Sequence, residues 1–215
     1  ALKAIDDTKF YPSKGRERIR SMIETRPDWC VSRQRVWGVP LPIFVNKKTK
    51  EVLVDDKVIE NIASIYEKEG SDCWFSDDPK RFLGDAYDTN DYEKLSDIVE
   101  VWFDSGSTHA FVLEKRKDLK WPASMYLEGS DQHRGWFHSS LLESCGTRGR
   151  APYESILSHG FVVDGKGLKM SKSLGNVIAP ENILKKYGAD ILRIWVASSN
   201  YEEDLRIDNS IIEQH

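Results

Sequence analysis

The sequence predicts an α/β fold built around a parallel sheet. Three short apolar runs indicate strands: Ile98 to Phe103, Met125 to Glu128 and Ile156 to Val163. A long stretch of helical pattern, from His133 to Cys145, separates the second run from the third. Two neighbouring parallel strands need this order of strand, helix and strand, because the chain has to cross back over the sheet.

The first predicted element is a helix from Ser13 to Thr25. Its apolar residues Ile19, Met22 and Ile23 recur at a helical period, and basic residues occupy the rest of its surface. We expect Pro27 to end it.

A β-hairpin is predicted next. Val39 to Val45 and Glu51 to Val54 read as strands, and the turn residues Asn46 to Lys48 lie between them. The segment from Asp55 to Lys94 then begins with a predicted helix, Val58 to Lys68, and continues with acidic and aromatic residues. We interpret it as a small inserted subdomain.

Two helices are predicted near the end of the chain. Pro180 stands at a plausible helix start and Gly188 at a plausible stop. The second helix, Ala189 to Ala197, is too apolar for a free surface helix, so we expect it to pack against a neighbour.

Composition and charge restrict the function. The 215 residues suffice for one domain, or for one domain and a smaller attachment. The 31 basic and 35 acidic side chains give a net charge of −4, so any RNA contact has to come from local basic patches. No apolar stretch could span a bilayer and no signal segment opens the chain, so we expect a cytoplasmic protein. Since the chain does not begin with Met, we expect an excised piece.

Metal ligands are sparse in the sequence. Cys30, Cys73 and Cys145 lie far apart and form no C-x-x-C pair, so reduced thiols are expected. His133 and His138 are five residues apart and do not share a helix face, which predicts that the chain binds no zinc.

The strongest functional signal is the segment from Gly165 to Asn176, called the lysine loop below. It places Lys169 and Lys172 three residues apart, with Ser171 and Ser173 beside them, between glycines that let the segment move. Ammonium groups on long stems stabilise an anion whose charge grows as a bond breaks, such as the pyrophosphate that leaves ATP. The spacing alone also fits a solvated surface turn.

A second signal, Glu128 to Gln132, follows the apolar strand that starts at Met125. In an open α/β sheet, ligands bind at the carboxyl ends of the strands. Glu128 and Asp131 offer carboxylates there to an ammonium group or to ribose hydroxyls. The alternative is that Ser130 or Asp131 only caps the helix that follows.

Three blocks of sequence, taken together, resemble a known family. Lys169 to Ser173 reads K-M-S-K-S, Leu127 to Phe137 reads L-E-G-S-D-Q-H-R-G-W-F, and Asp28 to Pro40 reads D-W-C-V-S-R-Q-R-V-W-G-V-P. In their order along the chain, the three blocks resemble the isoleucyl-tRNA synthetases, which are class I aminoacyl-tRNA synthetases. The resemblance covers nearly the whole chain. It implies the second half of a Rossmann-like nucleotide-binding sheet, with an inserted small subdomain and a C-terminal helical segment.

The resemblance divides the chain into four parts. Residues 1–54 would be a leading helix and hairpin after the family's editing insertion, and 55–97 the inserted subdomain. Residues 98–178 would be the C-terminal half of the catalytic domain with the lysine loop, and 179–215 the start of a helical region that contacts the tRNA stem.

The resemblance also assigns roles to side chains. Lys169 and Lys172 would be catalytic, with Lys172 the stronger candidate for direct phosphate contact. The other positions fall into three groups: Ser171, Ser173, Phe161 and Val162 for ATP, Glu128, Gly129, Asp131 and Gln132 for the aminoacyl-adenylate, and Trp102 and Trp136 for the walls of the amino-acid pocket. On pattern alone each tryptophan fits an ordinary core. His159 is assigned no chemical role, because a lone histidine at a strand end is more often structural.

The implied reaction is activation of isoleucine by ATP to isoleucyl-adenylate, with Mg²⁺ accompanying ATP, and transfer to tRNA(Ile). The family's H-I-G-H motif and its editing domain have no match here, so the chain is expected to need the missing half and to be inactive alone. Valyl- and leucyl-tRNA synthetases are alternatives. A non-catalytic tRNA-binding module would be a different class of function. Its contacts with tRNA would come from Lys14 to Arg20, Arg33, Arg35 and Lys185 to Arg193. These charges also fit solvated helix faces.

Overall fold

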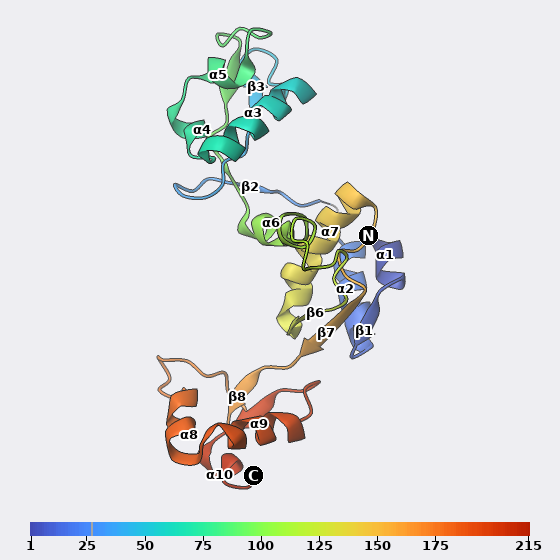
Figure 1. Cartoon of the computed structure of the whole chain (residues 1–215), viewed down its shortest axis with the longest axis vertical. Coiled ribbons are helices and arrows are strands. Elements are labelled where there is room, and N and C mark those ends of the chain that lie inside the picture. Colours follow the sequence, from blue (N-terminus) through green and yellow to red (C-terminus); the bar gives the residue numbers. More distant parts are fainter. Residues whose placement is uncertain (27) are drawn as a thin grey trace. The chain divides into compact units, whose positions relative to one another are not determined.

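A computed structural model describes residues 1–26 and 28–215 (Figure 1). The chain forms two compact units: the first is Ala1–Arg26 with Gly106–His215, and the second is Pro27–Ser105. The segment expected as an inserted subdomain, residues 55–97, lies within the second unit. The four boundaries that the resemblance implies stay predictions. No helix in the described part of the chain has the length and apolar character needed to cross a membrane.

The first unit contains a three-stranded parallel sheet in the order β1-β7-β6. Its strands are β1 (Lys9–Tyr11), β6 (Tyr126–Gly129) and β7 (Ser155–His159). Helix α7 (Trp136–Arg148) connects β6 to β7, so the α/β class and the predicted strand, helix and strand are confirmed. β1 is missing from the sequence prediction, because three residues are too few to show a strand pattern.

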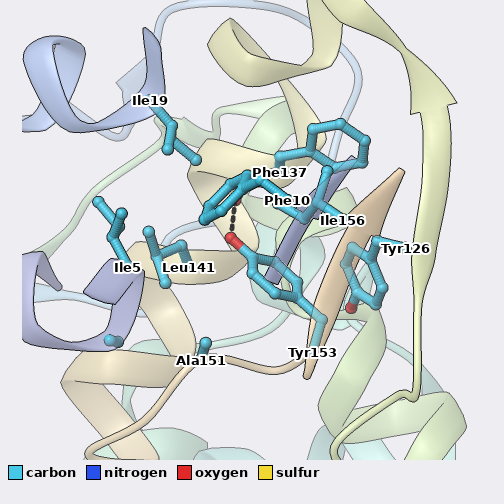
Figure 2. Close-up of a cluster of buried hydrophobic side chains, with 10 residues drawn as sticks. Ile5, Phe10, Ile19, Tyr126, Phe137, Leu141, Ala151, Tyr153 and Ile156 are labelled. Carbon is cyan, nitrogen blue, oxygen red and sulfur yellow. Dashed lines mark hydrogen bonds between the residues drawn. The ribbon is translucent and has the colours of Figure 1, made fainter. Parts of the chain in front are cut away.

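The core of the first unit lies between this sheet and its helices (Figure 2). Ile5 of α1 (Leu2–Asp6) and Ile19 of α2 (Lys14–Glu24) pack with Phe137 and Leu141 of α7. The buried Tyr153 hydroxyl donates a hydrogen bond to the backbone oxygen of Phe137 at 3.0 Å. The helix predicted at Ser13 to Thr25 is confirmed as α2, whereas Pro27, expected to end it, lies outside the described residues.

His138 of α7 gives the first unit a pH dependence that can be tested. Burial, helped by the positive charge of Arg26, lowers the pKa of His138 from 6.5 to about 4. The unfolded chain therefore binds a proton below pH 6.5 that the folded chain binds only near pH 4. We expect the free energy of unfolding to fall by about 3 kcal/mol as the pH drops across this window.

Urea unfolding at several pH values measures this effect. His138→Phe keeps a ring in the core and removes the titrating group, so most of the dependence between pH 6.5 and 4 should disappear. The neighbouring His133, whose pKa is also lowered by burial, accounts for part of what remains. A wild-type stability that stays constant across the window would contradict the assignment.

A second small sheet in the first unit carries the lysine loop. β8 (Val162–Asp164) and β9 (Leu205–Ile207) pair in parallel. The predicted run Ile156 to Val163 is therefore not one strand, because β7 ends at His159 and the chain enters a different sheet at Val162. The helices α8 (Pro180–Tyr187) and α9 (Ala189–Ser198) confirm the two predicted near the end of the chain.

Helix α9 packs as expected for its apolar composition. Its Trp195 is buried with Ile183, Ile207 and Ile212, the last from α10 (Asn209–Ile212). The remaining elements of the first unit are two short helical turns, η1 (His109–Leu113, π) and η2 (Ser130–Arg134, 3₁₀). Because η2 comes first, α7 begins three residues later than the predicted start at His133.

The second unit has its own core around Trp74, which packs with Phe44 and Phe82. Its helices are α3 (Asp56–Glu69), α4 (Cys73–Ser76), α5 (Pro79–Leu83) and α6 (Val101–Gly106), the last of which ends at the first residue of the other unit. Its strands are β2 (Ser32–Arg33), β3 (Phe44–Asn46), β4 (Tyr92–Lys94) and β5 (Ile98–Val99). The predicted helix Val58 to Lys68 is confirmed as α3.

The predicted hairpin forms, but its strands are shorter than predicted. β3 begins only at Phe44, since Pro40 and Pro42 cannot donate hydrogen bonds to a ladder. The amides of Asn46 and Leu53 donate to the backbone oxygens of Glu51 and Phe44, at 2.8 and 2.9 Å, on either side of an antiparallel bridge between Val45 and Val52. β3 also pairs with the antiparallel β4.

The run Ile98 to Phe103 is also not a strand of the parallel sheet. Only Ile98 and Val99 are extended, as β5, and they pair antiparallel with β2. From Val101 the chain is helical as α6. A six-residue apolar run does not distinguish a strand from a buried helix, and here the helix forms.

Candidate active site

The carboxyl end of β6 presents the predicted carboxylates. Glu128 and Asp131 are exposed there, on either side of the buried Gly129. A Cβ atom at Gly129 would lie 2.7 Å from Oδ1 of Asp131 and would push this carboxylate away. Gly129 therefore lets the Asp131 side chain fold back over the end of the strand.

Gln132 has a structural task besides its predicted role in binding. Its Oε1 accepts a hydrogen bond from the backbone amide of Trp136 at 2.8 Å, at the start of α7. Neither Ser130 nor Asp131 forms a side-chain cap at that helix start. The capping function that the sequence suggests for those residues belongs to Gln132.

Trp136 stacks on the buried ring of Tyr126 in β6. The ring centroids are 4.0 Å apart and the planes differ by 6°. A ligand could meet only the opposite face of this half-buried indole. Burial raises the pKa of Tyr126 to about 12, so its hydroxyl stays neutral at physiological pH. Trp102 is 41% exposed in the other unit, and its pairing with Trp136 as pocket walls stays a prediction.

The end of β7 lies beside the end of β6. His159 pairs in register with Gly129, and the Phe161 ring reaches within 3.8 Å of the Cβ position of Gly129. His159 Nδ1 donates to the backbone oxygen of Gly160 at 2.7 Å, which fits the structural role that the sequence suggests. Phe161 and Val162, predicted to bind ATP, are both exposed beside this rim.

Gly160 is tightly enclosed between β7 and the chain before β9. A Cβ atom there would lie 2.2 Å from the backbone oxygen of Glu203. We expect Gly160→Ala to lower the free energy of unfolding by about 1–3 kcal/mol, because backbone atoms have to move. Gly146→Ala in α7 is the matched control, since nothing outside its own stretch of helix lies within 4 Å of its Cβ position. It should stabilise the helix by roughly 0.5–1 kcal/mol. Equal urea midpoints for the two variants would refute the packing argument.

The lysine loop follows directly from β8. A tight turn at Asp164 to Gly167 reverses the chain, so that Lys169 forms an antiparallel bridge with Val163. A second turn follows, in which the Gly175 amide donates to the backbone oxygen of Lys172 at 3.2 Å. Both lysine side chains are exposed, as the prediction of mobile charges requires.

The two predicted hydroxyls of the loop contact each other. The oxygens of Ser171 and Ser173 are 3.1 Å apart, and Ser171 Oγ also accepts from the Leu174 amide at 3.3 Å. An open depression of about 600 Å³ lies against the loop. Its lining includes Lys166, Leu168, Leu174, Asn176 and Asp208.

Sequence reasoning missed the side chains that hold this loop. Asp164 accepts hydrogen bonds at the start of the loop, and Asn176 contacts Asp164, Lys169 and Ser171 at its end. Asp and Asn favour turns because their side chains bond to nearby backbone. This preference could have indicated that Asp164 and Asn176 form turns, although it does not identify the groups to which they bond.

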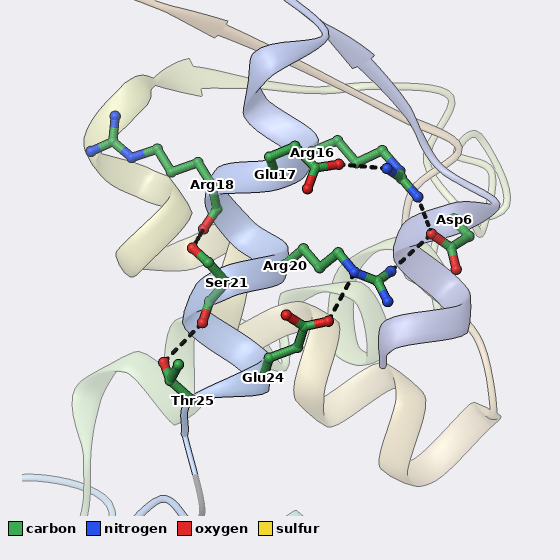
Figure 3. A network of polar contacts seen from close by, with 8 residues as sticks. All are labelled: Asp6, Arg16, Glu17, Arg18, Arg20, Ser21, Glu24 and Thr25. Carbon is green, nitrogen blue, oxygen red and sulfur yellow. Dashed lines mark hydrogen bonds and ion pairs between the residues drawn. The ribbon is translucent and has the colours of Figure 1, made fainter.

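Two of the four basic residues of α2, Arg16 and Arg20, form ion pairs (Figure 3). Arg16 contacts Asp6 and Glu17, while Arg20 contacts Asp6 at 3.0 Å and Glu24 at 2.9 Å. Lys186 likewise pairs with Glu213, and Arg193 with Asp190. This pairing favours solvated helix faces over an RNA-binding patch. Across residues 1–26 and 28–215, no three His, Cys, Asp or Glu side chains gather in a group that could hold a metal ion.

Comparison with known families gives one broad match. The family described as "tRNA synthetases class I (I, L, M and V)" matches residues 1–208. Among curated proteins, the isoleucine–tRNA ligase of Pelagibacter ubique is 89% identical over 215 residues, and that of Caldicellulosiruptor saccharolyticus is 57% identical over 219. Each match covers all of this chain and 24% of the relative. The chain thus spans about a quarter of the length of these relatives.

Solved structures match at the level of the fold. Mycobacterium tuberculosis methionyl-tRNA synthetase in complex with methionyl-adenylate gives a TM-score of 0.62 at 18% identity, over 99% of this chain and 33% of that one. The LeuRS in a ternary complex from Agrobacterium radiobacter K84 gives 0.60 at 21% identity, over 86% of this chain and 26% of that one.

Proposed function

Because this chain belongs to the class I tRNA synthetases of the I, L, M and V group, we propose that it is the second half of the Rossmann-like catalytic domain of an isoleucine–tRNA ligase. The relative that is 89% identical over the full chain carries that name. The complete protein would activate isoleucine with ATP and transfer it to tRNA(Ile).

The observation that carries the proposal is that the ends of β6 and β7 lie side by side and that the chain leads from the end of β7 into the lysine loop. Glu128 and Gly129 end β6, Phe161 lies beside them, and the chain continues from Phe161 through β8 into the lysine loop. This rim offers carboxylates for an ammonium or ribose group, an exposed ring, and two mobile ammonium groups downstream. These are the groups that binding an amino acid and a nucleoside triphosphate together requires.

In this proposal, the isoleucine carboxylate attacks the α-phosphorus of ATP in line with the leaving pyrophosphate. ATP enters as its magnesium complex. No protein nucleophile takes part, so this chain contributes positioning and charge stabilisation. Glu128, Gly129, Asp131 and Gln132 would hold the adenylate. Lys169 and Lys172 would follow the charge that develops on pyrophosphate, and the hydroxyls of Ser171 and Ser173 would lie beside it.

Amino-acid specificity is the finer part of the proposal. Trp136, with Tyr126 stacked behind it, would form one wall of an isoleucine pocket, and Trp102 the other. A single methylene in such a pocket separates substrates by only about 1–3 kcal/mol, so valine should be activated less efficiently, but measurably.

Amino-acid-dependent exchange of pyrophosphate into ATP tests the proposal. The complete ligase that contains this segment should exchange with isoleucine, about 10- to 200-fold less efficiently with valine, and least with leucine. Preference for valine or leucine would reassign the chain to one of those relatives. The isolated 215-residue chain should show no exchange, because the H-I-G-H half supplies the other groups that face ATP; robust exchange by the chain alone would overturn that part.

A further inference from the structure

The Asp164 carboxylate is a fixed point at the base of the lysine loop. Asp164 ends β8, pairs in register with Ile207 of β9, and is only 9% exposed. Its Oδ1 accepts hydrogen bonds from the backbone amides of Lys166 and Leu168, at 3.0 and 2.8 Å. The side chain therefore closes the turn with which the loop begins.

Asn176 ties the other end of the loop to this point. Its Nδ2 donates to Asp164 Oδ2 at 2.9 Å and to the backbone oxygen of Lys169 at 3.2 Å. Its Oδ1 accepts from the backbone amide of Ser171 at 2.9 Å. One amide group thus holds the backbone on both sides of Met170, which lies between the two lysines.

The side chains of the two lysines are less restrained than their backbone. In the described ranges, neither the Lys169 nor the Lys172 ammonium group forms an ion pair, and both side chains are exposed. Gly167 and Gly175 have φ values of +81° and +65°, a region that glycine enters without strain. Leu168 and Lys169 are tied to β8 through the Asp164 carboxylate and the backbone bridge to Val163, and Asn176 adds the side-chain link that holds Ser171 to the same point.

We propose that Asn176, anchored by Asp164, is a positioning residue that sets where Lys169 and Lys172 can reach during adenylate formation. This proposal rests on the proposed function and adds two residues to it that do not touch the substrate. The lysines supply charge, and the Asp164–Asn176 pair fixes the backbone from which they act. Misplacement of a group by about 1 Å can cost roughly a hundredfold in rate.

The first test is kinetic and uses a complete ligase that contains this segment. Asn176→Ala should lower the rate of adenylate formation by roughly 10- to 100-fold and change the KM for ATP by less than about threefold. Asn182→Ala, an exposed asparagine in α8, is the matched control and should match the wild type. A wild-type rate for Asn176→Ala would overturn the proposal.

A double-mutant cycle separates positioning from general damage. If Asn176 acts through the lysines, Asn176→Ala should lower the rate of adenylate formation by less than about threefold when Lys172→Ala is already present. The same cost in both backgrounds would mean that Asn176 only supports the fold. If Lys172→Ala alone leaves the rate unchanged, the proposed function fails, and the next measurement still decides the role of Asn176.

Limited trypsin digestion reports on the loop without any activity. Asn176→Ala should speed cleavage after Lys169 and Lys172 by about tenfold or more, because the released backbone enters the protease more often. Asn176→Asp alone places two carboxylates together, so this variant should be cleaved by trypsin at least as fast as Asn176→Ala. Adding Asp164→Asn to Asn176→Asp restores an amide–carboxylate pair with the donor reversed. This double variant should be cleaved more slowly and should recover part of the rate of adenylate formation. Unchanged cleavage in Asn176→Ala, or no recovery in the double variant, would overturn the inference.

Discussion

Lys172→Ala, made in a complete ligase that contains this segment, should lower the rate of isoleucyl-adenylate formation by about 10²–10³-fold. The Michaelis constant for ATP should change much less. The physical reason is that negative charge on the pyrophosphate oxygens grows only as the bond to the α-phosphorus breaks, so an ammonium group nearby stabilises the transition state more than bound ATP. The exposure of Lys172 on a loop between two glycines would let it follow that charge.

Lys166→Ala is the matched control for this experiment. Lys166 belongs to the same loop and is also exposed, but it lies in the first turn, before Lys169. Its removal should change the rate by less than about threefold. Pre-steady-state formation of the adenylate measures both variants. Equal changes in rate and in the Michaelis constant for Lys172→Ala would show that this lysine only binds ATP, and the proposed role would fail.

Phe137→Ala should remove about 3–5 kcal/mol from the free energy of unfolding of the first unit. The Phe137 ring is fully buried between the sheet and helices α1 and α2, and its backbone oxygen accepts the Tyr153 hydroxyl (Figure 2). Truncation to Ala therefore removes apolar contact and leaves a cavity that the surrounding strands and helices can fill only in part.

Phe111→Ala provides the comparison, because this ring belongs to the same unit and is 57% exposed. Its replacement should stay within about 1 kcal/mol of the wild type. Urea unfolding of both variants, followed by far-UV circular dichroism, gives the two values. A Phe137→Ala variant as stable as Phe111→Ala would mean that the core does not lie where the structure has it.

The helices could be predicted because their signals are local. α2 and α3 show apolar residues at a helical period, and α8 starts at Pro180 and stops before Gly188, where the backbone turns to a φ of +85°. Each of these signals acts within a few residues of the chain. They need no knowledge of the rest of the molecule.

The strands were predicted less well because their partners are remote. Ile98 to Phe103 is as apolar as a strand, yet most of it is helical, and β1 becomes a strand only through its pairing with β7, more than a hundred residues away. Pro40 and Pro42 were visible in the sequence and argued against a long strand before β3. That local signal should have carried more weight than the apolar pattern.

The sequence by itself determined the α/β class, the main helices and the spacing of charges and glycines in the lysine loop, since charge, glycine and periodic pattern are properties of neighbouring residues. Only the tertiary structure decided which side chains hold the candidate site residues in place. Gln132 caps α7, Tyr126 covers one face of Trp136, and Asn176 reaches back to Asp164. Turn preference can suggest that an Asn or Asp bonds to backbone, but its partner depends on how strands and turns bring the chain together.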